Sequence, residues 1–95
     1  MILTELIDNI KSLAILRNYL VKTENKVLYF YKNNPRFFGL FFDSVLIGHL
    51  EICEDLKTLI LTIPPSTSPM IEYYQSELKK IITSIVEIDT NYKLT

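Results

Sequence analysis

The sequence predicts an α+β domain in which an antiparallel sheet of three or four strands, connected as a meander, is flanked by an N-terminal and a C-terminal helix. Two observations carry this prediction. Apolar residues recur at three- and four-residue steps near both ends of the chain, as on one face of a helix. The middle of the chain contains short β-branched and aromatic runs separated by short polar gaps. Gaps this short favour antiparallel hairpins, because a parallel crossover needs about a dozen residues.

The length and composition predict a single domain over residues 1–95. A chain of 95 residues can bury one hydrophobic core but not two separate ones. Hydrophobic residues make up 48% of the chain and charged residues 22%, which is typical of a folded globular protein rather than a disordered one.

The N-terminal segment is expected to form an amphipathic helix over residues 3–22. Its apolar stripe comprises Leu3, Leu6, Ile7, Ile10, Leu13, Ala14, Leu20 and Val21. Ile15, Leu16 and Tyr19 widen the apolar surface in the second half of this helix. We therefore expect that half to contact both the sheet and a partner.

Four apolar runs are expected to be strands because they are rich in β-branched and aromatic residues: 26–32, 36–42, 45–52 and 58–63. Asn33-Asn34-Pro35 predicts a turn after the first run. Asp43-Ser44 predicts a two-residue hairpin turn between the second and third runs. In the alternative interpretation, these two runs form one long bent strand with Gly39 or Gly48 at a β-bulge.

A second amphipathic helix is expected over residues 69–89. Ser68 is a favourable N-cap, and Pro69 suits the first helical position. The apolar stripe of this helix comprises Ile71, Tyr74, Leu78, Ile81, Ile82, Ile85 and Ile88. The tail 90–95 is expected to fray. Because each helix has one apolar stripe, the simplest arrangement places both helices on one face of the sheet.

Aromatic residues are concentrated in the predicted sheet. Tyr29, Phe30, Tyr31, Phe37, Phe38, Phe41 and Phe42 lie close together in the sequence. Neighbouring residues of a strand point to opposite faces, so aromatic side chains would project from both faces, whereas two helices cover only one. Three interpretations stay open: burial of both faces within the chain, a homodimer or partner interface, and a stacking platform for single-stranded nucleic acid.

The interface interpretation gives the predicted function. We expect a small non-enzymatic protein-interaction module that forms a homodimer, or that binds another protein as a subunit or adaptor, through an aromatic-rich sheet surface. The candidate interface residues are Tyr19, Tyr29, Tyr31, Arg36, Phe38 and Phe41. The alternative is a small protein that binds single-stranded nucleic acid through Lys26, Lys32 and Arg36.

The overall charge disfavours a nucleic-acid partner. Ten Lys and Arg residues stand against eleven Asp and Glu residues, and the formal net charge is −1. Proteins that bind duplex nucleic acid usually carry a basic excess, because neutralising phosphates supplies much of their affinity. A local basic patch around the first predicted strand remains compatible with this balance.

Candidate catalytic and metal-binding residues are few. His49 and Cys53 are the only histidine and the only cysteine, and neither belongs to a catalytic or zinc-binding motif. We therefore predict no enzyme activity, no metal and no cofactor. Glu5 and Asp8 interrupt the first apolar stretch, which disfavours a signal peptide, and no apolar run is long enough to span a bilayer. These features predict a cytoplasmic protein with no membrane partner.

Overall fold

The computed structural model describes residues 3–36, 41–87 and 91–95, with the side chains of 34–36 and 41–43 left out of the description. The elements are α1 (Leu3–Leu16), β1 (Leu20–Glu24), β2 (Val27–Arg36), β3 (Phe41–Cys53), β4 (Thr58–Thr62), α2 (Pro69–Val86) and β5 (Lys93–Leu94). The predicted α+β class is confirmed, with a mostly antiparallel sheet between an N-terminal and a C-terminal helix.

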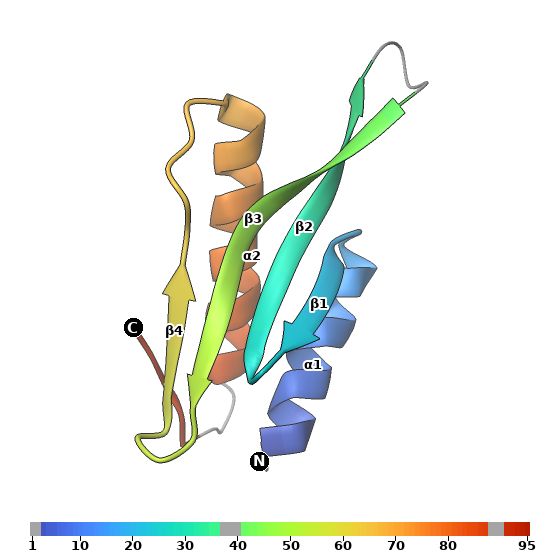
Figure 1. Ribbon diagram of the computed structural model, residues 1–95. Coiled ribbons are helices and arrows are strands. Elements are labelled where there is room, and N and C mark those ends of the chain that lie inside the picture. The colour runs from blue at the N-terminus through green and yellow to red at the C-terminus, as the bar shows by residue number, and fades with distance from the viewer. Residues whose placement is uncertain (1–2, 37–40, 88–90) are drawn as a thin grey trace.

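The fold has two layers, a sheet and a pair of helices that covers one face of it (Figure 1). Within the described residues, the five strands of the sheet lie in the order β1-β2-β3-β4-β5, and the pairing of β4 with β5 is parallel while the other pairings are antiparallel. Both helices lie on one face of this sheet, with α1 behind β1 and α2 behind β3. The simple arrangement expected from the two apolar stripes is therefore the observed one.

The hydrophobic core fills the space between the two helices and this sheet face. The largest fully buried side chains are Phe30, Leu6, Ile10, Leu28, Ile47, Leu50, Leu59, Leu78 and Ile82. On β2, Leu28 and Phe30 are buried, whereas the intervening Tyr29 is only partly buried. This alternation follows from the period of two along a strand, and it fixes which face of the sheet meets the helices.

The first helix ends at Leu16, so the prediction of a helix over 3–22 is wrong in its last part. Asn18 has a left-handed backbone, with φ of 66°. The N–H of Asn18 donates to Ile15 O at 2.9 Å, and the N–H of Tyr19 donates to Ala14 O at 3.0 Å. These two bonds form a Schellman motif, which satisfies the last carbonyls of α1 and reverses the chain.

The residue at position 18 should therefore control the stability of this reversal. We expect Asn18→Val to lower the free energy of unfolding by about 1–2 kcal/mol, because a β-branched residue resists positive φ. Asn18→Gly should leave it unchanged or raise it by a few tenths of a kcal/mol. Chemical denaturation of both variants measures the difference. Equal stability of the two variants would contradict the role of the left-handed residue.

The reversal produces β1, a strand that the sequence analysis did not predict. β1 pairs antiparallel with β2, from Leu20 opposite Tyr31 to Glu24 opposite Val27. The connection between them is the two-residue turn Asn25-Lys26, whose φ values of 47° and 65° are both positive. Two positive φ values define a type I′ turn, whose twist matches that of a β-hairpin.

Two predicted turns are wrong, because both segments lie inside strands of the β2–β3 hairpin. Asn33-Asn34-Pro35 lies inside β2, and Asp43-Ser44 lies inside β3, where Ser44 pairs with Asn33. Beyond Tyr31, β2 has no partner in β1, so this part of the strand has an open edge on which proline is tolerated. The alternative of one long strand in place of runs 36–42 and 45–52 is confirmed only from Phe41 on, where β3 runs without a turn to Cys53, whereas Arg36 belongs to β2 and pairs with Phe41. The long hairpin of β2 and β3 projects beyond the rest of the sheet (Figure 1).

A β-bulge lies in β3 beside Gly48, as the long-strand alternative expected. Phe30 pairs with Gly48 and Tyr31 with Leu46, so Ile47 is the extra residue. Ile47 is fully buried. The bulge therefore turns an additional apolar side chain into the core at the point where the hairpin bends. The expectation for Gly39 falls outside the described residues.

Gly48 also has a packing role, because α2 crosses close to it. A Cβ atom at this position would lie 3.1 Å from the Thr62 carbonyl oxygen and 3.3 Å from Leu78 Cδ2. We expect Gly48→Ala to lower the free energy of unfolding by about 1–3 kcal/mol, because the rigid strand backbone limits relaxation. Thermal and chemical unfolding measure this effect. Stability equal to the original chain would show that α2 can shift away at no cost.

The C-terminal half largely follows its prediction. Ser68 caps α2, its side chain accepting a hydrogen bond from the Ile71 N–H, and Pro69 opens the helix. The expectation that the tail frays is wrong for the described residues 91–95. The Lys93 N–H donates to Lys57 O and the Thr95 N–H to Leu59 O, both at 2.9 Å. The tail is thereby held beside β4 as the short strand β5.

Candidate interaction surface

The face of the sheet opposite the helices carries the predicted tyrosines. Cross-strand partners share a face, so the register defines this surface, which we name the tyrosine face. It comprises Leu20, Lys22, Glu24, Val27, Tyr29, Tyr31, Leu46, His49, Glu51, Ile60 and Thr62. Both helices lie behind the sheet on its other side (Figure 1).

The two tyrosines are each in contact with a neighbouring strand. The Tyr29 and His49 ring centroids lie 5.6 Å apart with the rings tilted by 42°. Lys22 Nζ lies 5.6 Å from the centroid of the Tyr31 ring, a cation–π distance. A shallow hollow beside these rings is also lined by Thr23 and Glu24. The aromatic rings are thus partly packed but remain accessible, as the side chains of a binding surface are.

β1 forms an open edge next to the tyrosine face. It is the outermost strand of the sheet order, and in the described part of the chain no further strand pairs with it. The Ile52 N–H donates to Lys26 O, so even-numbered residues of β2 direct their backbone groups to β3 and odd-numbered ones to β1. Leu20, Lys22 and Glu24 are the partners of those odd-numbered residues. The backbone groups of Val21 and Thr23 therefore point away from the sheet.

The structure corrects the placement of Tyr19 as an interface residue. Its side chain is only 2% exposed, because the chain reversal directs it into the core. The Tyr19 hydroxyl lies 2.9 Å from Glu77 Oε1 and 2.8 Å from Tyr74 O, within hydrogen-bond distance of both acceptors. Burial, and then the hydrogen bond to Glu77, raises the pKa of Tyr19 above its ordinary value. Tyr19 thus ties the start of β1 to α2.

Lys32 is held beside the same ring. Lys32 Nζ donates to Arg17 O, and it lies 4.2 Å from the Tyr19 ring centroid and 4.7 Å from that of Tyr74. Its ammonium group is therefore on the helix side of the sheet. It satisfies a carbonyl at the end of α1 and faces two aromatic rings.

Removing the Tyr19 hydroxyl should weaken the fold in a pH-dependent way. We expect Tyr19→Phe to lower the free energy of unfolding by about 1–2 kcal/mol at neutral pH, because Glu77 and the Tyr74 carbonyl lose a donor. An unfolded tyrosine ionises near pH 10, whereas the folded Tyr19 holds its proton to higher pH. The difference between the two proteins should therefore be full below about pH 10 and shrink as the pH rises above it. Urea denaturation at a series of pH values measures both effects, and a difference that grew above pH 10 would contradict them.

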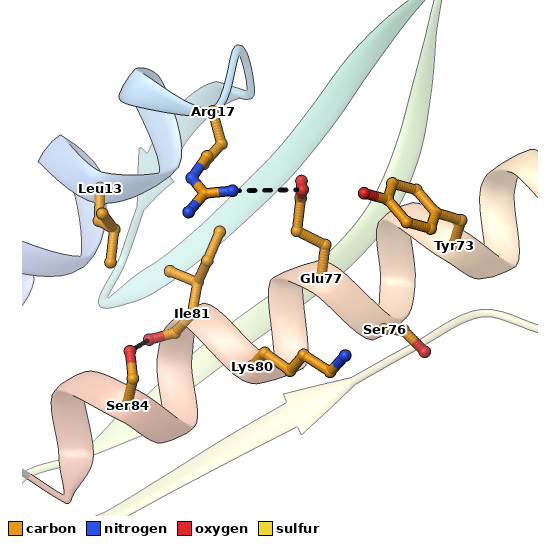
Figure 2. Close-up of a pocket in the computed structure, with 8 residues that line it drawn as sticks. All are labelled: Leu13, Arg17, Tyr73, Ser76, Glu77, Lys80, Ile81 and Ser84. Atoms are coloured by element: carbon orange, nitrogen blue, oxygen red, sulfur yellow. Dashed lines mark hydrogen bonds and ion pairs between the residues drawn. The ribbon is translucent and has the colours of Figure 1, made fainter.

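A second concave feature lies between the helices (Figure 2). Leu13 and Arg17 line it from α1 and the end of that helix, and Tyr73, Ser76, Glu77, Lys80, Ile81 and Ser84 line it from α2. Its volume is about 430 Å³. Arg17 Nη1 lies 3.8 Å from Glu77 Oε2, and Ser84 Oγ donates to Ile81 O at 2.8 Å. This groove combines both signs of charge, and its described side chains form no nucleophile–base pair.

The predicted site residues are only partly brought together. Tyr29 and Tyr31 lie side by side on the tyrosine face. The side chains of Arg36 and Phe41, and the whole of Phe38, fall outside the described residues. Lys22, Thr23 and Glu24 were not among the predicted interface residues, because the sequence pattern places Lys22 at the end of a helix and Thr23 and Glu24 in the break that follows it.

The predicted basic residues point in different directions. Lys26 Nζ lies 2.8 Å from Glu54 Oε2 in an exposed ion pair at the turn before β2. That contact raises the pKa of Lys26 and lowers the pKa of Glu54, each through the hydrogen bond between them. Lys32 lies on the helix side of the sheet, six residues along the strand. These two lysines do not form one surface.

The chemistry of the remaining polar residues is limited. In the described ranges, no three His, Cys, Asp or Glu residues are grouped as metal ligands. His49 Nδ1 is buried and has no hydrogen-bond partner, and Cys53 is a partly buried free thiol. Of the two helices in the described residues, neither has the length and apolarity needed to cross a membrane.

Comparison with known protein families, with curated proteins and with solved structures finds no match to this chain.

Proposed function

We propose that this protein is a small non-enzymatic interaction module that forms a homodimer through the uncovered side of its sheet. This side consists of the tyrosine face and the open edge of β1 that borders it. The observation that carries the proposal is the position of both helices on one face, which leaves Tyr29 and Tyr31 accessible on the other.

The composition of the tyrosine face supports a protein partner. Tyrosine is enriched in protein interfaces because its ring is apolar while its hydroxyl accepts and donates hydrogen bonds. Leu46 and Ile60, which are also only partly buried, extend the apolar surface across β3 and β4. Leu20 is 45% exposed at the margin of β1. Together these side chains form the mixture of aromatic, aliphatic and polar groups that interfaces use.

The size of the molecule is compatible with a stable dimer. The described chain extends 45 × 23 × 22 Å along its principal axes. A stable interface buries roughly 800 Å² on each partner. One long side of this molecule offers more area than that, so a second copy has room to form an interface of ordinary size.

The charges of the face favour a second copy over a nucleic acid. Lys22 lies two residues from Glu24 on β1, so the face presents both signs close together. A second copy carries the complement of such a pattern, whereas a polyphosphate would be repelled by its carboxylates. Lys26 is paired with Glu54 and Lys32 faces the helices, so the nucleic-acid alternative gains no continuous basic surface from them.

The molar mass in solution tests this proposal. We expect light scattering after gel filtration to give twice the chain mass of 11.1 kDa, with dissociation on dilution. Circular dichroism confirms folding at each concentration. A folded protein with the mass of one chain at every concentration would contradict self-association.

A further inference from the structure

We propose that two copies pair through their β1 strands, antiparallel, with a two-fold axis at Thr23. The inference rests on the self-association proposed above and names the contact and its register. It starts from the backbone: Val21 and Thr23 direct their N–H and C=O groups away from β2. A neighbouring strand of a second copy would satisfy these groups and continue the sheet.

The edge of β1 has no proline and no bulge to block pairing, and its two charged residues, Lys22 and Glu24, are of opposite sign. Natural sheets shield their edges with prolines, bulges, charges or very short strands. The opposite edge of this sheet is the two-residue β5, and the open part of β2 contains Pro35. β1 is a regular five-residue strand with the sequence LVKTE. It contains no proline, and no bulge interrupts its pairing with β2.

Hydrogen bonding restricts the register to a few choices. In an antiparallel pair, the residues whose backbone groups point outward must face each other. The two-fold axis can therefore lie at Thr23, at Lys22 or at Val21. Each choice leaves the backbone bonds between β1 and β2 unchanged, so side chains must decide among the three.

The charges of β1 favour the axis at Thr23. That axis places Lys22 of each copy directly opposite Glu24 of the other, which gives two attractive pairs, and it places the two Thr23 residues opposite each other. An axis at Lys22 would place two lysines opposite each other, which is repulsive. An axis at Val21 would place Lys22 opposite Leu20 and leave its charge without a partner.

This pairing would place the tyrosine faces of the two copies beside each other, and the contact between the copies would lie at the β1 edge rather than on these faces. A two-fold axis perpendicular to the sheet keeps both sets of helices on one side. The dimer then has a continuous sheet of ten strands, five from each copy, with the two tyrosine faces side by side. Tyr31 and Lys22 lie next to the junction in each copy.

Reciprocal charge reversal tests the register. We expect Lys22→Glu and Glu24→Lys each to raise the dissociation constant of the dimer about tenfold or more, because each places like charges opposite one another at two positions. The double variant Lys22→Glu with Glu24→Lys should restore the original value to within about twofold. Lys79→Glu, a charge reversal on the exposed surface of α2, is the control and should have no effect. Sedimentation equilibrium at constant ionic strength measures all five proteins.

Proline substitution tests the backbone pairing separately. Thr23→Pro removes an N–H that points away from β2, so the fold should survive while the dimer dissociates. Thr23→Val keeps the N–H and should remain a dimer. Circular dichroism and thermal unfolding verify that both variants are folded. If Thr23→Pro is unfolded, the charge-reversal set alone decides.

The outcomes separate this inference from the proposed function. An original chain that is monomeric overturns both. A dimer that survives Thr23→Pro and both single charge reversals, but dissociates in Tyr31→Lys, keeps the proposed function and overturns β1 pairing. A double reversal as weak as the single variants overturns the register at Thr23.

Discussion

The reversal of the chain at Asn18 determines how the remaining elements are arranged. The Schellman bonds end α1 and place Tyr19 in the core, where its hydroxyl reaches Glu77 and the Tyr74 carbonyl on α2. Lys32 then lies over the buried ring from β2. One short segment thus connects both helices to the sheet. It also places the start of β1 beside the end of α1, because the strand begins at Leu20, directly after the reversal.

The asymmetry of the sheet follows from the number of helices. A sheet face needs an apolar cover, and α1 and α2 together cover one face of the five strands. The side chains of β2 show the resulting alternation: Leu28 and Phe30 are buried, whereas Tyr29 and Tyr31, one position further along, are only partly buried. The outer positions are therefore aromatic and polar rather than purely aliphatic. Such a face tolerates water and remains able to bind a protein surface.

The sequence predicted the parts of this fold whose signals are local and agree with one another. Ser68 and Pro69 predicted the start of α2, and the β-branched and aromatic composition of run 26–32 predicted a strand where β2 lies. The prediction from sequence was wrong where one segment fitted both a helical and a strand pattern. Leu20 and Val21 continue the helical stripe, yet they also begin a strand. The left-handed backbone of Asn18, which lies between them and α1, ends the helix and makes the strand possible. Asn33-Asn34-Pro35 has a turn composition, but pairing with β3 overrides it. Because β1 was missed, the charges on its edge were missed as site residues.

Those charges give the edge a specificity that its backbone lacks. Any strand offers the same N–H and C=O groups, so an open edge alone does not distinguish its own copy from another protein. In an antiparallel self-pairing, the residues on either side of the central one face each other. Opposite charges at those two positions are therefore self-complementary, whereas like charges would repel. The order Lys22-Thr23-Glu24 meets this condition, so the two charges that flank the open backbone groups of Thr23 also select an identical partner and one register.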